Sequence, residues 1–396
     1  MIPLLRLEEP APAARTGTAW LALGFRPFYF LASVFAALSV PLWALQFSGL
    51  LGQPYLSGPV WHAHEMLFGF ALAVIVGFLF TAGHNWTNQP TPTGRPLAAL
   101  VALWLAARVL VLTPWGVAAA VANVAFPLAA AGALAAPFWR ARNRRNYFFV
   151  GLLLLLAGAA AVLHLTQLGV LSAAPHRAVG VALDVVLFIL AVMGGRVIPM
   201  FTNNGVPGAG AERRPAVERV ALGALLVLGV ADAADLPWPV VAAVAGAAGL
   251  AHGLRWALWR PWRTGRAPLV WVLHLAYAWV PVHLGLRAAA AFGWVPASLG
   301  THALTVGAVG GLVIGMITRT ARGHTGRPLK ADRYEVACYL AVAAAAAVRV
   351  GVPLLAPALL MPAVLASALL WSAGFGLYAV RYWPVLSRPR LDGRPG

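Results

Sequence analysis

Long apolar runs separated by short polar breaks dominate the chain. Each run is about twenty residues long, which lets a helix cross the roughly 30 Å hydrocarbon core of a bilayer. The pattern predicts an all-α polytopic membrane protein whose twelve-helix domain covers residues 25–383, between an N-terminal segment at 1–24 and a tail at 384–396. The predicted spans lie near residues 25–47, 62–82, 97–113, 117–139, 147–168, 178–199, 217–234, 238–256, 268–290, 299–319, 334–354 and 358–381.

Composition excludes a water-soluble domain. Of the 396 residues, 61% are hydrophobic and 10% are charged, and the mean hydropathy is +0.79, whereas soluble domains carry about 25% charged residues. The lipid bilayer is therefore the first partner that the sequence indicates. Prolines such as Pro54, Pro90, Pro114 and Pro199 lie at or between the runs and are expected to end helices there. The first run continues as a full span, so a cleavable secretory signal is not expected.

Basic residues alternate along the chain and predict its orientation. Most of the 29 Lys and Arg residues fall in the N-terminal segment, the even-numbered connections and the tail, whereas the odd-numbered connections hold only Arg177, Arg287 and Arg349. By the positive-inside rule both termini are expected to be cytoplasmic, in a multi-pass protein of the bacterial inner (cytoplasmic) membrane. The net charge of +18 is dispersed over these segments, so anionic lipid explains it and no nucleic-acid partner is expected.

The ten histidines sort by depth once this orientation is set. The outer half is expected to hold His62, His64, His164, His176, His283 and His302, and the inner half His84, His252, His274 and His324. The single cysteine, Cys338, excludes thiolate clusters, so a metal would rely on histidine, carboxylate or thioether ligands. Any one of these histidines is more often a hydrogen-bonded core residue than a ligand. For the outer set as a whole the balance reverses, because the bilayer offers no water to six imidazoles.

Helix geometry separates histidines that are close in sequence. His62 and His64 are two residues apart, so their side chains differ by about 200° in direction and are expected to meet different partners. One of them is expected beside Glu65, an acidic residue inside an apolar run, where ionisable groups are usually paired or functional. His274 and His283 also face opposite ways, so at most one of them belongs to any single site.

An internal similarity predicts three pseudo-repeats of four helices. Thr93–Leu97 and Thr325–Leu329 have the same sequence, and each follows a helix that begins with a histidine, His64 or His302. The sixth predicted helix is a weaker third copy. The repeat places the second, sixth and tenth helices around a common interior, with His64 and His302 facing each other across it.

Several motifs give the chain a resemblance to a known family. They are Leu23–Phe28, Trp61–Phe70, Gly194–Pro199, Trp271–Trp279, His302–Gly307, Thr318–Arg319 and Gly323–Leu329. Together they are similar to the NnrS family over nearly the whole chain. The resemblance implies a haem- and copper-containing membrane protein linked to bacterial nitric oxide metabolism and resistance to nitrosative stress. It also implies that metal ligands lie among the matched positions His62, His64, Glu65, Arg196, His274, His302 and His324.

A more distant likeness is to the catalytic subunit of haem-copper oxidases and nitric oxide reductases, which also has twelve spans and haem ligands on its second and tenth helices. The chain departs from that pattern because its tenth helix has one histidine where the oxidases have His-x-His, and its seventh helix has no adjacent histidine pair. An oxidase-type binuclear centre is therefore not expected. The architecture is expected to be haem-copper-oxidase-like only in its helices and their repeat.

Two functions follow from these expectations. The first is haem binding, with copper as a second metal and nitric oxide as ligand, for which the cofactor-binding candidates are His64, His302, His274, Arg196 and Glu65. The candidate metal ligands are His62, His64, His302, His283, His164 and His324. An enzyme of this kind would be an oxidoreductase acting on nitric oxide or in electron transfer, and the sequence names no electron donor. The alternative is a transporter of a small ion or metabolite, which the repeats, the glycine-rich helices and the embedded charges would also suit.

Overall fold

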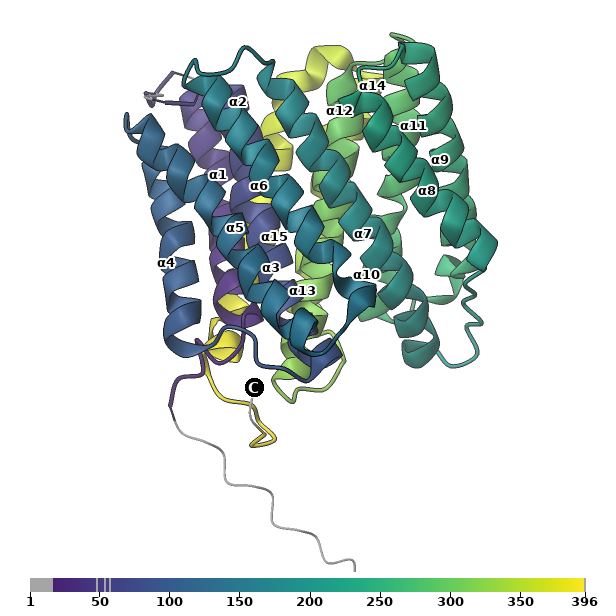
Figure 1. Cartoon of the computed structure of the whole chain (residues 1–396). Coiled ribbons are helices and arrows are strands. Elements are labelled where there is room, and N and C mark those ends of the chain that lie inside the picture. The colour runs from purple at the N-terminus through teal and green to yellow at the C-terminus, as the bar shows by residue number, and fades with distance from the viewer. Residues whose placement is uncertain (1–16, 48, 53–54, 57, 395–396) are drawn as a thin grey trace, which may run out of the picture.

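The computed structural model describes residues 17–47, 49–52, 55–56 and 58–394, and every regular element in this part of the chain is helical (Figure 1). In chain order the elements are α1 (Phe25–Phe47), α2 (Gly58–His64), η1 (Glu65–Ala71), α3 (Leu72–Thr87), α4 (Gly94–Leu110), α5 (Gly116–Arg140), η2 (Arg144–Asn146), α6 (Phe148–Gln167), α7 (Pro175–Gly205), α8 (Pro215–Ala233), α9 (Trp238–Leu258), η3 (Pro261–Arg263), α10 (Pro268–Tyr277), α11 (Trp279–Ala291), α12 (Ala297–His302), η4 (Ala303–Gly310), α13 (Gly311–His324), α14 (Arg333–Leu355), η5 (Pro357–Leu359) and α15 (Leu360–Ser387).

The elements form twelve helical rods, because α2, η1 and α3 continue one another, as do α10 with α11 and α12 with η4 and α13. Each predicted span falls on one rod, which confirms the all-helical prediction. Ten rods in the described part are long and apolar enough to cross a membrane. The prediction of twelve membrane spans is therefore supported for ten rods and not for the other two, α4 and α8. The 17 residues of α4 reach only about 26 Å, and α8 carries three charged side chains, Glu218, Arg219 and Asp232.

Proline does not stop helices here as consistently as predicted. Pro199 was expected to end the sixth helix, but α7 runs through it to Gly205. Proline removes only one backbone donor, and in a membrane helix the neighbouring turns and side chains can satisfy the carbonyl that this leaves. The consequence is a 31-residue rod in which Thr202 still belongs to the helix, past the predicted end of the span at residue 199.

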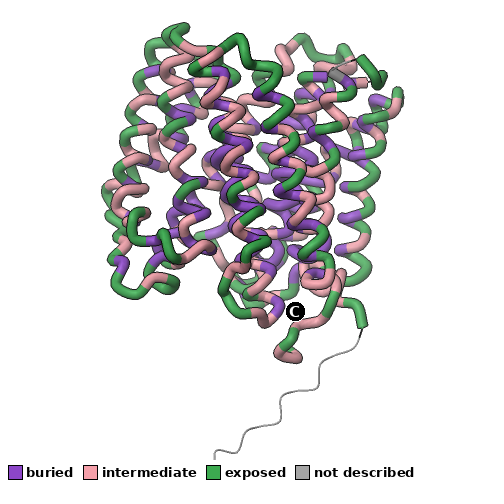
Figure 2. Tube along the Cα trace, turned by 180° about the vertical axis from the view of Figure 1, so that it is seen from behind, coloured by how far each residue is buried: buried purple, intermediate pink, exposed green. Residues whose placement is uncertain are grey.

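The surface of the bundle suits lipid. Buried residues lie in the interior, and exposed ones cover the outward faces of the rods (Figure 2). Many exposed side chains are large and apolar, among them Leu250, Leu355, Leu369, Val230 and Val380. An apolar outer surface of this extent is stable in hydrocarbon and not in water.

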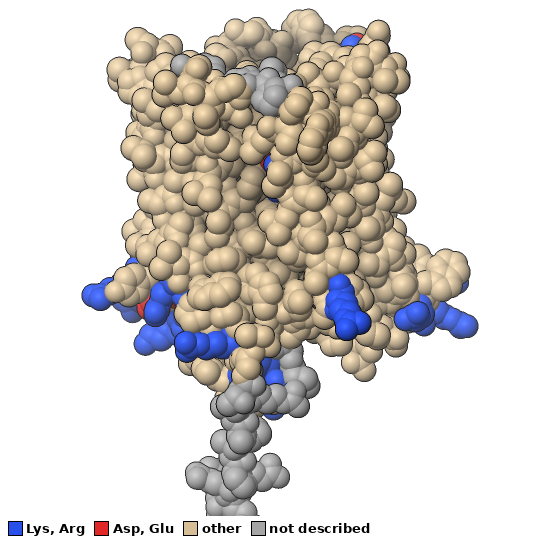
Figure 3. Space-filling model, turned by 90° about the vertical axis from the view of Figure 1, so that its left-hand side faces the viewer, with Lys and Arg blue, Asp and Glu red and all other residues tan. Residues whose placement is uncertain are grey.

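Basic side chains gather at one end of the bundle (Figure 3). We call this the basic end; it holds the connections 88–93, 141–147, 206–214, 259–267 and 325–332 and the tail at 388–394. The two ends of the described chain meet there, because the backbone N–H of Ala19 donates to the Ser387 carbonyl at 2.8 Å. The predicted alternation of charge is therefore a real asymmetry between the ends of the bundle.

Two rods contain wide π-helical turns at corresponding places. The π-helix η1 begins directly after His64, and η4 begins directly after His302. The duplicated segments also share a backbone feature, since Gly94 and Gly326 both have positive φ, at 55° and 71°. These local likenesses fit the predicted repeat, which as a relation between whole groups of helices stays a prediction.

Candidate metal and cofactor site

His62 and His64 leave their rod in different directions, as their spacing predicts. His64 is fully buried and meets α6, whereas His62 lines a cavity on another side of the rod. The two histidines therefore belong to separate groups of residues, described in turn below.

The first group is centred on two imidazoles in direct contact. His64 Nε2 lies 3.1 Å from His164 Nε2, and the two rings are close to perpendicular. Nδ1 of His64 lies 2.6 Å from Glu65 Oε1, and Nδ1 of His164 lies 2.9 Å from the Tyr55 hydroxyl. One proton arrangement satisfies all of these groups: Tyr55 donates to His164, His164 donates to His64, and His64 donates to Glu65.

Tyr55 makes the last hydrogen bond of this series and lies in the connection between α1 and α2. Burial raises the pKa of Tyr55 to about 12, so its hydroxyl stays protonated and can donate to His164. Its backbone carbonyl also accepts from the Gln167 side chain at 3.1 Å, which ties the connection to the end of α6.

Glu65 links the histidine pair to a buried cation. Arg108 donates to the Glu65 carboxylate and also to the Asn123 side chain, and all three residues are buried. The Asn123 amide is held in turn by the Ala119 carbonyl at 2.8 Å. A carboxylate in a dry interior is costly unless it is paired, so Arg108 supplies the buried counter-charge beside the Glu65 oxygen that meets His64.

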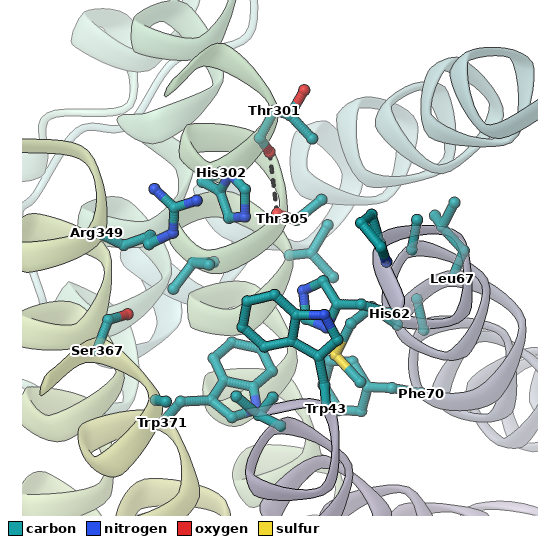
Figure 4. A pocket seen from close by; sticks show the side chains of 18 of the residues that line it. Trp43, His62, Leu67, Phe70, Thr301, His302, Thr305, Arg349, Ser367 and Trp371 are labelled. Atoms are coloured by element: carbon teal, nitrogen blue, oxygen red, sulfur yellow. Dashed lines mark hydrogen bonds between the residues drawn. The ribbon is translucent and has the colours of Figure 1, made fainter. Parts of the chain in front are cut away.

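The second group surrounds a cavity of about 290 Å³, here called the His302 cavity (Figure 4). The rods containing α1, η1, α7, η4, α14 and α15 all contribute to its wall. Figure 4 shows His302 beside Arg349 and His62 beside Trp43, with Phe70 and Trp371 in the same wall. Most other lining residues are aliphatic, so the cavity is an apolar chamber with a few polar side chains.

The hydrogen bond of His302 fixes which ring nitrogen faces the cavity as an acceptor. Nδ1 lies 2.7 Å from the Ser298 carbonyl oxygen, which can only accept, so Nδ1 carries the proton. In the neutral ring the lone pair is then on Nε2. This tautomer, oriented by a backbone carbonyl, is the one that metal-bound histidines usually adopt.

His62 faces the same cavity in a less satisfied state. Its ring lies against Trp43, with centroids 4.6 Å apart, and its Nδ1 is buried with no hydrogen-bond partner in the described part of the chain. Nearby, one terminal nitrogen of Arg349 is buried in the same condition. Buried polar atoms without partners are uncommon and mark places where a ligand can complete the structure.

The remaining candidates do not join these two groups. His274 Nε2 donates to the Thr202 hydroxyl at 2.7 Å, and Nδ1 of His283 donates to the Gly300 carbonyl at 2.8 Å. Arg196 and His324 line a different cavity at the basic end. The structure therefore brings His302 together with His62, and His64 together with His164, and it does not place His64 in the cavity of His302. Among the described residues, no group of three or more His, Cys, Asp or Glu side chains is arranged to hold a metal ion.

Several residues of the site carry no sequence signal that would have identified them. Tyr55 lies in a connection, Asn123 and Ser298 resemble ordinary packing or capping residues, and Trp43 is one of 16 tryptophans. Arg108 is recognisable as a membrane-embedded base, but its partner Glu65 is 43 residues away. Only the packing of the rods reveals these contacts.

A bundle of apolar helical rods with ion pairs and imidazoles buried inside it defines an all-helical integral membrane protein. The chain belongs to the NnrS family, because the family's sequence model, described as NnrS protein, matches residues 19–390. No curated protein matches the chain.

Proposed function

We propose that this protein binds haem in the His302 cavity and acts in nitric oxide metabolism or in resistance to nitrosative stress. The observation that carries the proposal is the state of His302, which lines an apolar, aromatic chamber: its Nδ1 is held by the Ser298 carbonyl, and its Nε2 has no hydrogen-bond partner among the described residues. Family membership supports the same reading, because the family name points to nitric oxide.

The chemical character of the residues that line the His302 cavity suits a haem. Phe70, Trp43 and Trp371 provide aromatic walls for a planar apolar ring, and Arg349 provides a cation for its carboxylates. The volume of about 290 Å³ is slightly below the usual range for ligand pockets, roughly 300–1,000 Å³. Admitting a whole macrocycle therefore requires the aromatic walls to move apart.

Each residue then has a distinct task. His302 would hold the haem iron through Nε2, the Ser298 carbonyl fixes the tautomer of His302 and raises its basicity, and His62 lines the same cavity from another rod. When bound, haem would supply an iron centre able to bind nitric oxide or pass electrons. The aliphatic walls exclude water, which protects such a centre and sets its potential.

The His64 and His164 pair is the place where copper would fit best. Two Nε2 atoms converge there, and the Nδ1 atoms of both rings are already oriented, one by Glu65 and the other by Tyr55. His64 and His164 would hold copper through their Nε2 atoms, and the negative charge of Glu65 would help to offset the charge of the ion. This assignment uses two of the histidines predicted as metal ligands.

We further propose that the basic end faces the cytoplasm of a bacterial inner membrane. Both ends of the described chain lie at that end, together with most of the basic connections. The two histidine groups then lie toward the outer face. Nitric oxide is small and apolar, so it would reach an apolar chamber through the bilayer without a polar channel.

An absorption spectrum of the purified protein tests the haem proposal. The wild-type protein is expected to show a Soret band, and His302→Ala is expected to lose or shift it while the amount of protein in the membrane stays the same. His176→Ala is the matched control, because His176 is exposed and outside both groups. A wild-type protein without a Soret band would contradict the proposal and favour the transporter alternative. An unchanged spectrum in His302→Ala would show that the ligand lies elsewhere.

A further inference from the structure

A second cavity opens at the basic end, between the rods of α3, α7 and α13. Its volume is about 430 Å³, larger than that of the His302 cavity, and the two share no lining residue. We call it the arginine cavity; it is lined by Phe78, Thr81, Ala82, Asn85, Trp86, Met193, Arg196, Val197, Met200, Phe201, Met316, Arg319, Thr320, Gly323, His324 and Leu329. Two arginines and no carboxylate contribute to this wall.

Arg319 is the more unusual of the two arginines. Its side chain is only 9% exposed, and its guanidinium carbon lies 3.7 Å from the centre of the Phe201 ring. In the described part of the chain it meets no carboxylate, whereas the buried Arg108 and Arg255 pair with Glu65 and Glu218. An aromatic face offsets only part of the cost of burying a cation.

Arg196, on α7, also lines the cavity and also lacks a carboxylate partner in the described part of the chain. One terminal nitrogen donates to the Asn146 side chain at 2.7 Å. Its guanidinium otherwise lies among Trp86, Phe148 and Phe149, at 5.5–5.7 Å from the ring centres. A guanidinium has five N–H donors, so most of those on Arg196 remain available to a ligand.

The rest of the polar wall also suits an anion. Asn85 has an amide that can donate, Thr320 a hydroxyl and His324 an imidazole, and none of them brings a negative charge. Guanidinium groups match the paired oxygens of carboxylates and phosphates in geometry as well as in charge. The charged part of a ligand here is therefore an oxyanion.

The cavity also has an apolar extension. A smaller cavity of about 80 Å³ continues toward the middle of the bundle and shares Phe78, Met193, Val197 and Met316 with the arginine cavity. Its other walls are mainly aliphatic, with Val74, Ile189 and Leu312 among them. Methionine side chains are flexible and fill irregular gaps, so this wall can adapt to a chain of carbons.

We infer that the arginine cavity binds an amphiphilic oxyanion, with its charged group between Arg196 and Arg319 and its apolar chain along Met193 and Met316. Two sources share this chemistry: the phosphodiester of an anionic phospholipid and the carboxylate of a fatty acid. A cavity at the basic end of a membrane bundle lies at the depth of the headgroups, where such molecules are abundant. This site is separate from the proposed haem site and does not depend on it.

Ligand-dependent thermal stability of the delipidated protein in neutral detergent tests the inference. The probes are dioctanoyl phosphatidylglycerol, dodecanoate and inorganic phosphate, with dioctanoyl phosphatidylcholine as the uncharged control lipid. At least one of the two anionic amphiphiles is expected to raise Tm, and phosphate alone is not. Arg319→Gln should weaken that ligand about tenfold, since a hydrogen bond to a charged group is worth about that factor. Because Arg319 has no ion-pair partner within the described part of the chain, this variant should still fold.

Arg196→Gln is the second variant and should weaken the same probe. Arg266→Gln is the matched control, because Arg266 is exposed at the same end and lies outside the cavity. If only phosphatidylglycerol raises Tm, the ligand is an anionic phospholipid, and if only dodecanoate does, it is a fatty acid. The inference is overturned if neither amphiphile stabilises the protein, if phosphate does so equally well, or if Arg319→Gln responds like the wild type. It is also overturned if Arg319→Gln loses haem absorption, because the arginines would then serve the cofactor.

Discussion

The Nε2 atoms of His64 and His164 lie 3.1 Å apart inside the bundle, although 100 residues separate them in sequence. At this distance one of the two nitrogens must carry a proton, because two bare lone pairs would repel each other. Tyr55 and Glu65 at the two ends of the pair set the direction of donation. The pair is therefore neutral and oriented, and both Nε2 atoms could hold a metal ion if the His164 proton moved to Nδ1, where the Tyr55 hydroxyl can accept it.

Replacing His164 with alanine should have two effects. It leaves His64 Nε2 without a partner and opens a cavity, so the free energy of unfolding should fall by about 2–4 kcal/mol. It should also reduce bound copper to well below the wild-type ratio, because one of the two converging nitrogens is gone. Thermal unfolding and elemental analysis measure these effects, with His176→Ala as the control. Wild-type copper content in both His64→Ala and His164→Ala would exclude this pair as the copper site.

Replacing Glu65 with glutamine should destabilise the protein strongly. Arg108 would remain buried with no counter-charge, which typically costs about 3–5 kcal/mol. The double variant Glu65→Gln, Arg108→Met should recover much of that loss, because it removes the stranded cation. Asp235→Asn provides the contrast, since the Arg177–Asp235 pair is exposed and should contribute less than about 1 kcal/mol. Equal stability of the double and single variants would contradict the assigned role of Arg108.

Gly195 should not tolerate alanine. A Cβ atom there would lie 1.8 Å from a terminal nitrogen of Arg255, which is fixed by two hydrogen bonds to Glu218. The substitution should lower the free energy of unfolding by about 1–3 kcal/mol, as overpacked cores usually do. Gly158→Ala is the matched control in α6, where a Cβ meets no atom within 4 Å and helix propensity should add up to about 1 kcal/mol. Similar melting temperatures for the two variants would refute the predicted clash.

Asp332 should make the start of α14 sensitive to acid. Its carboxylate caps the helix by accepting from the backbone N–H groups of Tyr334 and Glu335. Burial alone would raise the pKa of Asp332, but the hydrogen bonds from Arg381 and from these N–H groups lower it below its usual value. The stabilisation is thus complete above the unfolded pKa of about 3.9 and is lost as pH falls through the lower folded value. Asp332→Ala should cost about 1 kcal/mol at pH 7 and flatten the acid limb of stability against pH, whereas an unchanged limb would contradict this.

Reporter fusions should place the two ends of the bundle on opposite sides of the membrane. A fluorescent protein fused after Arg394 should fluoresce in the cytoplasm, and alkaline phosphatase fused after Gly293 should be active outside it. The expectation rests on the gathering of basic residues at one end. Signals that put both positions on the same side would rule out the proposed orientation.

The sequence predicts where each rod lies along the chain and in which direction it runs. It does not predict which face each rod turns toward its neighbours. Apolar runs and charge alternation locate each rod and its direction, because these properties act within about twenty residues. The divergence of His62 and His64 also follows from helix geometry alone. What the sequence does not contain is the direction in which each rod faces its neighbours. That is why His64 was expected to meet His302 and instead meets His164, which was predicted in the same set of histidines but not as the partner of His64.

The buried ion pairs show the same limit. Arg108 and Glu65 are both recognisable as costly residues inside apolar runs, and the need of each for a partner is predictable. Their pairing depends on how the rod of α4 packs against η1, which no local pattern encodes. Similarly, the glycines of Gly194–Gly195 were noted only as part of a motif, and the arginine and tyrosine side chains packed against them explain why small residues stand there.

The π-helical turns after His64 and His302 change the direction in which the side chains of each rod point before and after the turn. In η1 the N–H of Leu72 bonds to the Leu67 carbonyl, five residues back, so the turn takes up an additional residue. One residue corresponds to about 100° of rotation in a helix. The histidine-bearing end of each rod can therefore face its polar partners while the glycine-rich remainder keeps the rotation that close packing demands. Within a single continuous helix, the contacts of the histidine and the close packing of the glycines are thereby set independently of each other.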